Sequence, residues 1–99
     1  MKIPKHSSLP EQAEQAPGLV FPCAIDVKIF INNRMEDEGV IRAYLEQQLE
    51  VEQLLNWSYR ESSGGKYLAI TARVDAQSRA HIDDLYRLLN AHERVIMLI

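Results

Sequence analysis

The sequence has little of what disulfide, zinc or redox chemistry requires. Cys23 is the single cysteine among 99 residues, so an internal disulfide is impossible and the chain has no CxxC pair. A free thiol is typical of proteins in a reducing compartment, which predicts a cytoplasmic location. A solitary cysteine at the start of an apolar segment more often packs as a small hydrophobe than acts as a nucleophile, so we assign Cys23 no catalytic role.

The chain also lacks a long hydrophobic run. Lys2 and Lys5 are not followed by an apolar segment, so we expect no signal peptide. The longest uninterrupted apolar stretch is Val95–Ile99, which is far too short to cross a bilayer. The sequence therefore predicts no membrane-spanning segment.

Catalytic and metal-binding motifs are missing as well. The sequence contains no HExxH, Walker, GxSxG or calcium-loop pattern. His6 lies near the N-terminus, whereas His81 and His92 are separated by about 16 Å along a predicted helix, too far for one metal ion. We expect no metal, no cofactor and no enzymatic activity. The formal net charge of -3 and the pI near 5.5 also disfavour a protein that binds nucleic acid.

The clearest structural signal is a glycine turn, Ser62–Gly65, that leads into a segment with a side-chain period of two. One face of this segment carries Leu68, Ile70, Ala72 and Val74, and the other carries Tyr67, Ala69, Thr71 and Arg73. The alternation predicts a strand, and the turn predicts a hairpin with a preceding strand at Asn56–Glu61. We expect the strand that follows the turn to be central to the sheet.

The remaining segments can be assigned in chain order. Residues 1–18 are rich in proline, serine and glutamine, which predicts a flexible tail before a single domain at residues 19–99. The alternating segment Cys23–Ile31 is a predicted strand, and a predicted helix over residues 34–50 begins after an Asn33 cap. Residues 51–55 fit either a helix end or a loop. Ser78 is a predicted N-cap for a second helix that ends near Ala91, with an ion pair between Asp83 and Arg87, and Val95–Ile99 forms the last strand.

The predicted order is strand, helix, strand, strand, helix, strand. Right-handed crossovers place the first and third strands in the centre and both helices on one face. The sequence thus predicts an α+β, ferredoxin-like βαββαβ two-layer sandwich, in which a four-stranded antiparallel sheet carries two helices on one face.

Four short motifs, taken together, resemble the YbeD-like family of small bacterial proteins. They are Phe21-Pro22, the Ser62-Ser63-x-Gly65-x-Tyr67 turn, Asp84-Leu85-Tyr86 and Val95-Ile96-Met97-Leu98. The resemblance covers residues 21–99. It implies a ferredoxin-like fold similar to ACT-type regulatory domains, and it implies no established biochemical activity.

ACT-type sensors usually place glycine in the turn after the first strand, where the ligand meets the backbone. Here the turn contains Asn32, Asn33 and Arg34 and no glycine. Asparagine in this place is more typical of a turn and cap, but the three side chains remain a candidate ligand site at a dimer seam. RNA binding is a more distant alternative, because Tyr67 is followed by Ala69 at the next outward position, where stacking would need another aromatic ring.

The sheet face without helices is the stronger candidate site. In the last strand both rows are apolar, and two helices can bury only one of them. The tail, a second copy or a protein partner would then cover the rest. The predicted partner interface consists of Phe30, Tyr67, Ala69, Thr71, Ile96 and Leu98, with Val95, Met97 and Ile99 as the alternate row. We therefore predict a non-catalytic, ACT-like regulatory or interaction module, acting as a homodimer or with a protein partner, and a small-metabolite sensor as the alternative.

Overall fold

The computed structural model describes residues 20–99, so the predicted tail at residues 1–18, including His6, lies outside the described residues. The elements are β1 (Cys23–Asn32), α2 (Asp37–Glu46), the 3-10 helix η1 (Val51–Gln53), β2 (Leu54–Glu61), β3 (Tyr67–Ala76), α3 (Arg79–Ala91) and β4 (Val95–Leu98). Within residues 20–99 the sheet has four strands in the order β2-β3-β1-β4, and every neighbouring pair is antiparallel.

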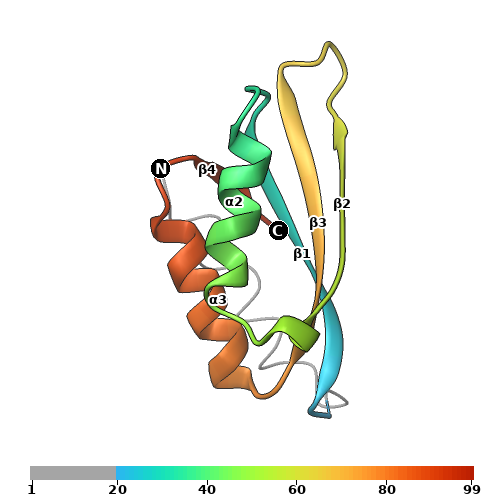
Figure 1. The fold of residues 1–99 in the computed structure, drawn as a ribbon, viewed down its shortest axis with the longest axis vertical. Coiled ribbons are helices and arrows are strands. Elements are labelled where there is room, and N and C mark those ends of the chain that lie inside the picture. Colours follow the sequence, from blue (N-terminus) through green and yellow to red (C-terminus); the bar gives the residue numbers. More distant parts are fainter. Residues whose placement is uncertain (1–19) are drawn as a thin grey trace.

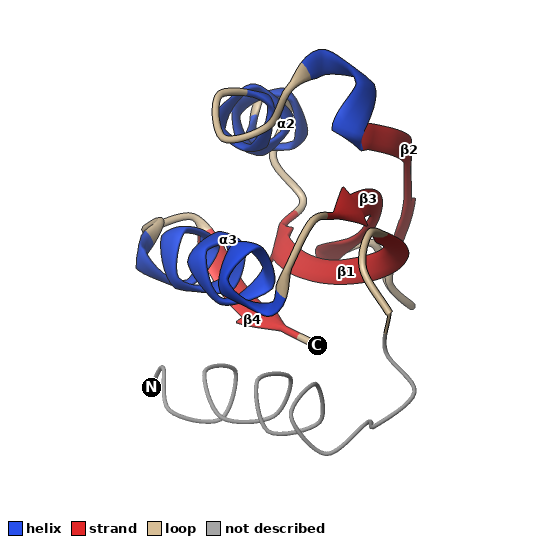
Figure 2. Ribbon diagram, turned by 90° about the horizontal axis from the view of Figure 1, so that it is seen from below, coloured by secondary structure: helices blue, strands red, loops and turns tan. Residues whose placement is uncertain are grey.

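The molecule has two layers. Helices α2 and α3 lie side by side on one face of the sheet, with β2 at the outer edge beyond β3 (Figure 1). The view in Figure 2 separates the helical layer from the sheet. The two helices are joined by the Tyr44 hydroxyl, which donates to the Leu88 carbonyl oxygen at 2.9 Å. This arrangement confirms the predicted ferredoxin-like βαββαβ sandwich.

The hydrophobic core lies between the helices and one face of the sheet. Strand register places Val27 beside Ala72, and Ile29 beside both Ile70 and Leu98. The apolar stripe of α3 (Ile82, Leu85, Leu89) and that of α2 (Ile41, Leu45) close over these rows. The period-two rows predicted for β1 and β3 are therefore confirmed, because the same rows are buried.

Helix α2 is shorter than predicted, and its predicted cap is wrong. It runs over Asp37–Glu46 rather than residues 34–50, and Glu36 occupies the N-cap position without a side-chain hydrogen bond. Asn33 instead donates from Nδ2 to the Gly65 carbonyl oxygen at 2.8 Å. The side chain that would have capped the helix thus ties the β1–α2 turn to the β2–β3 hairpin.

Of two predictions for side-chain contacts of α3, one is confirmed and one is wrong. Ser78 caps α3 as predicted, because its Oγ accepts from the His81 backbone N–H at 3.1 Å. The predicted Asp83–Arg87 pair is wrong, since Arg87 Nη2 pairs with Asp84 Oδ1 at 2.7 Å. A spacing of three along a helix brings two side chains together as readily as a spacing of four.

Candidate interaction surface

We call the sheet face opposite the helices the open face, and two rows of side chains cross it on all four strands. The first row runs Arg60, Ala69, Phe30 and Met97 from β2 to β4. The second runs Ser58, Thr71, Lys28 and Ile99, the last of these paired with Lys28 by two backbone hydrogen bonds of 3.0 and 3.3 Å. Apolar side chains therefore concentrate on β1 and on its two neighbours, β3 and β4.

The pairing of β4 with β1 shows which side chains of β4 lie on the open face. Leu98 lies opposite Ile29 on the helix side and is only 2% exposed, so its predicted place in the interface is wrong. Met97 lies opposite Phe30 on the open face and is 40% exposed. Ile96 lies at the register shift between the Phe30–Met97 and Ile31–Val95 pairings and is exposed. Of the alternate row, Met97 and Ile99, the residue after β4, are exposed, whereas Val95 lies opposite Ile31 and is only 3% exposed, so its predicted place in that row is wrong.

The other predicted interface residues lie where the sequence placed them. Phe30, Ala69 and Thr71 are half-buried on the open face, and Tyr67 lies at its hairpin end beside Asn32. Lys66 Nζ lies 5.5 Å from the centre of the Tyr67 ring, so one face of this aromatic side chain already has a cation over it.

The charges on the open face differ from those of the whole chain. Arg73 pairs with Asp26 at 3.1 Å, whereas Lys28 and Arg60 form no ion pair within residues 20–99. These two cations flank a shallow hollow of about 390 Å³ that Phe30, Ala69 and Thr71 help to line. An apolar strip beside two cations that have no ion-pair partner among the described residues favours an acidic, partly apolar partner.

The predicted ligand residues do not form one pocket. Arg34 is exposed and separates two hollows of about 370 and 320 Å³; Asn33 lines the first and Asn32 the second. The Asn33 amide is already engaged by Gly65, which lowers its capacity for a ligand.

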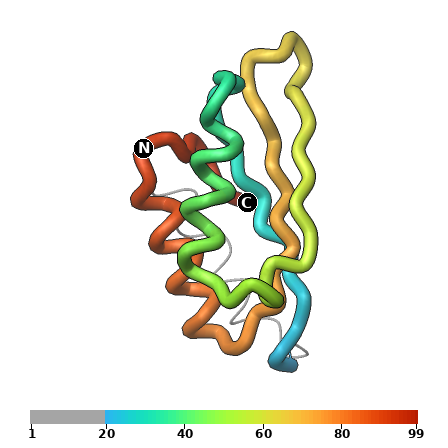
Figure 3. Tube along the Cα trace, viewed as in Figure 1, coloured from blue at the N-terminus to red at the C-terminus, as the bar shows by residue number. Residues whose placement is uncertain are grey.

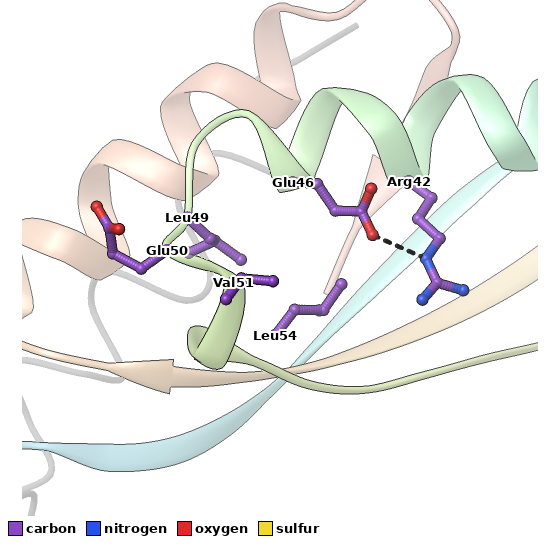
Figure 4. A pocket seen from close by; sticks show the side chains of 6 residues that line it. All are labelled: Arg42, Glu46, Leu49, Glu50, Val51 and Leu54. Atoms are coloured by element: carbon purple, nitrogen blue, oxygen red, sulfur yellow. Dashed lines mark hydrogen bonds and ion pairs between the residues drawn. The ribbon is translucent and has the colours of Figure 1, made fainter.

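A second surface, between α2 and β2, was not found by sequence reasoning. Trp57 Nε1 donates to Glu38 Oε2 at 2.6 Å, and the Arg42 guanidinium lies 5.7 Å from the ring centre. On the same side of the molecule, a hollow of about 360 Å³ lies between the C-terminal end of α2 and η1 (Figure 4). Its lining consists of Arg42, Glu46, Leu49, Glu50, Val51 and Leu54. The apolar residues of the ambiguous segment 51–55 were the signal that could have indicated it.

The two described histidines and Tyr86 make hydrogen bonds to the backbone. Residues 20–99 contain no cluster of three histidine, cysteine or acidic side chains able to hold a metal ion. His81 and His92 each accept a backbone hydrogen bond through Nδ1, from Gln77 and Arg94. Burial raises the pKa of the Tyr86 phenol above its ordinary range, and its hydroxyl donates to the Ile99 carbonyl oxygen at 3.1 Å. No described helix is long and apolar enough to span a bilayer.

Among solved structures, the chain is similar to the solution structure of protein HP0495 from H. pylori. The TM-score is 0.69, and the match covers 86% of this chain and 89% of that one. Sequence identity is 12%, so the likeness concerns the fold alone.

Comparison of sequences identifies the family of this chain. A UPF0250 protein of Chromobacterium violaceum is 34% identical over 85 residues, covering 80% of this chain and 89% of the relative. A UPF0250 protein of Paraburkholderia phytofirmans is 35% identical over 75 residues, covering 76% and 84%. One from Neisseria gonorrhoeae is 29% identical over 85 residues. The family model described as "Protein of unknown function (DUF493)" matches residues 16–99. The predicted resemblance is thereby confirmed: the chain belongs to the DUF493 family, the YbeD-like group of UPF0250 proteins of unknown function.

Proposed function

We propose that this protein is a non-catalytic regulatory or protein-interaction module that receives a partner on the open face and the outward row of β4. The observation that carries the proposal is the Phe30–Met97 pair, an apolar centre on a sheet face that the helices do not cover. In a two-layer domain such a surface is typically completed by another chain or segment.

The charged side chains around the Phe30–Met97 pair indicate which kind of protein would bind there. Lys28 and Arg60 provide positive charge without ion-pair partners in residues 20–99, although the whole chain has a formal charge of -3. A protein partner with an apolar ridge and acidic flanks would match both features. The absence of an aromatic side chain at Ala69 continues to disfavour single-stranded RNA, for which stacking platforms are needed.

The test compares two methionines that differ in position. Met97→Glu places a charge in the open face, whereas Met35→Glu places it on a side chain that is 99% exposed and lies in the β1–α2 loop. Labelled protein is titrated with clarified bacterial lysate and followed by amide NMR. We expect broadening along Tyr67–Thr71 and Ile96–Ile99 in the native chain and in Met35→Glu, and its loss in Met97→Glu. Equal broadening in both variants, or broadening confined to other segments, would contradict the proposal.

A small-metabolite sensor remains the second candidate, favoured by the two hollows on either side of Arg34. A guanidinium at that place suits a carboxylate ligand. Titration with a mixture of amino acids would then shift the amides of residues 32–35 and raise the melting temperature, and Arg34→Gln would abolish both effects. Shifts that persist in Arg34→Gln would exclude this site.

A further inference from the structure

Within residues 20–99, one edge of strand β2 has no neighbouring strand, and we infer that two copies of this chain pair through it, antiparallel, into one continuous sheet. The pairing uses the backbone edge of β2 and not the apolar centre at Phe30 and Met97, although Ser58 and Arg60 of β2 also lie on the open face. The inference therefore goes beyond the proposed function. Figure 3 shows β2 as the outermost strand on its side of the sheet, with β3 as its neighbour.

The middle of the β2 edge lacks the usual protection against strand pairing, although Arg60 and Glu61 and an irregular pairing at Leu54–Asn56 lie at its ends. Edge strands are commonly kept short or guarded by charges and proline. Strand β2 has eight residues, against four in β4 at the opposite edge, and Asn56–Tyr59 contains neither a charge nor a proline. Exposed apolar side chains also gather along this side of the molecule: Val51 is 92% exposed and Tyr59 54%.

The direction of the backbone groups can be read from the hairpin. The Ser62 N–H donates to the Tyr67 carbonyl oxygen at 2.8 Å, so it points toward β3. Backbone groups alternate along a strand, and the register of β2 with β3 is regular from Asn56 to Glu61. The N–H and C=O groups of Trp57, Tyr59 and Glu61 therefore point away from β3, toward the free edge.

Self-pairing about a two-fold axis at Ser58 matches this pattern. It places Trp57 of each copy opposite Tyr59 of the other, and residues whose backbone groups point outward then exchange two hydrogen bonds in each pair. Aromatic side chains directly opposite each other stabilise an antiparallel pair. The Trp57 ring is held in place by the hydrogen bond to Glu38 and by the Arg42 guanidinium.

The side chains that would face each other in the dimer favour a two-fold axis at Ser58 over an axis at a neighbouring residue of β2. With the axis at Ser58, Arg60 faces Asn56 of the second copy, and no like charges are opposed. An axis at Tyr59 would oppose Trp57 with Glu61, and an axis at Arg60 would oppose two guanidinium groups. An axis at Trp57 would draw in the irregular pairing between Leu54 and Asn56. The two-fold axis at Ser58 fits best.

A charge at the two-fold axis tests the inference, because Ser58 is exposed and would face itself. Sedimentation velocity of the full chain over a wide concentration range should show a reversible dimer. Ser58→Glu and Ser58→Lys should each raise the dimer dissociation constant about tenfold or more through like-charge repulsion. A mixture of the two variants should recover the dimer as a heterodimer. A native chain that stays monomeric at every concentration, or a Ser58→Glu variant that dimerises like the native chain, would overturn the inference.

Four further variants report on the register of the dimer and on the surface that forms it. Asn56→Asp should tighten the dimer by facing Arg60, and Asn56→Lys should weaken it; the reverse order would exclude the axis at Ser58. Ser63→Glu, in the exposed hairpin turn, is the matched control and should leave the dimer unchanged. Met97→Glu should also leave it unchanged. Loss of the dimer in Met97→Glu alone would assign self-association to the open face and overturn pairing through β2, whereas failure of the lysate titration would bear only on the proposed function.

Discussion

Arg94 and Asp37 join two parts of the chain that are 57 residues apart. Arg94 Nη1 lies 2.9 Å from Asp37 Oδ1 and links the loop before β4 to the first turn of α2. The Asp37 side chain is 7% exposed and that of Arg94 38%. The carboxylate also lies at the positive end of the helix dipole, which adds to its stabilisation. The pair therefore holds the short last strand against the helical layer.

Removing the arginine should be costly because it leaves a buried carboxylate without its ion-pair partner. We expect Arg94→Leu to lower the free energy of unfolding by about 1–3 kcal/mol. Arg87→Leu is the matched control: its pair with Asp84 is solvent-exposed, and such pairs contribute about 1 kcal/mol or less. Urea unfolding followed by circular dichroism measures both. Equal losses in the two variants would show that the Asp37 contact has no special role.

The buried phenol of Tyr86 predicts a loss of stability at alkaline pH. Burial raises its pKa in the folded state above the unfolded value of about 10. Below that value both states keep the proton and stability does not depend on this group. At higher pH the unfolded chain loses the proton while the folded chain retains it, so the free energy of unfolding falls as pH rises.

Tyr86→Phe should remove this part of the pH dependence. At neutral pH the variant should lose about 0.5–1.5 kcal/mol, the usual contribution of a hydrogen bond such as that to Ile99. Urea titrations from about pH 8 to about pH 11 give the slope of stability against pH. An unchanged slope in Tyr86→Phe would mean that another group controls the alkaline transition.

The two rows of β4 should respond differently to truncation. Leu98→Ala removes a side chain buried against Ile29 and should cost about 2–5 kcal/mol. Met97→Ala removes a half-exposed side chain and should cost about 1 kcal/mol or less. Chemical denaturation of both variants checks which row the helices cover, and the opposite ranking would reverse the assignment.

Two glycines should respond to alanine with opposite signs. Gly39 lies in α2 and nothing approaches within 4 Å of an added Cβ, so Gly39→Ala should stabilise by about 0.5–1 kcal/mol. Gly64 has a φ of +87° in the hairpin turn, so Gly64→Ala should destabilise by about 1 kcal/mol. Thermal unfolding of both variants checks the pair. A stabilising Gly64→Ala would indicate that the turn can adopt another backbone conformation.

The family assignment and the fold followed from local patterns. Alternation in β1 and β3, the glycine turn between β2 and β3, and the Ser78 cap each depend on residues close together in sequence, so the sequence predicted them correctly. The open-face positions of Phe30, Tyr67, Ala69 and Thr71 followed from the same alternation. Their role as an interface stays a prediction.

The sequence by itself determined the order and type of the main strands and helices, though not the ends of α2 or the start of β2, because period and turn chemistry are local properties. Only the tertiary structure decided between the two apolar rows of β4, since the register with Ile29 buries Leu98 and leaves Met97 outside. It also assigned Asn33 to Gly65 rather than to the helix, and Arg94 to Asp37. Each of these choices depends on a partner distant in sequence, and such a partner becomes available only when the strands have paired.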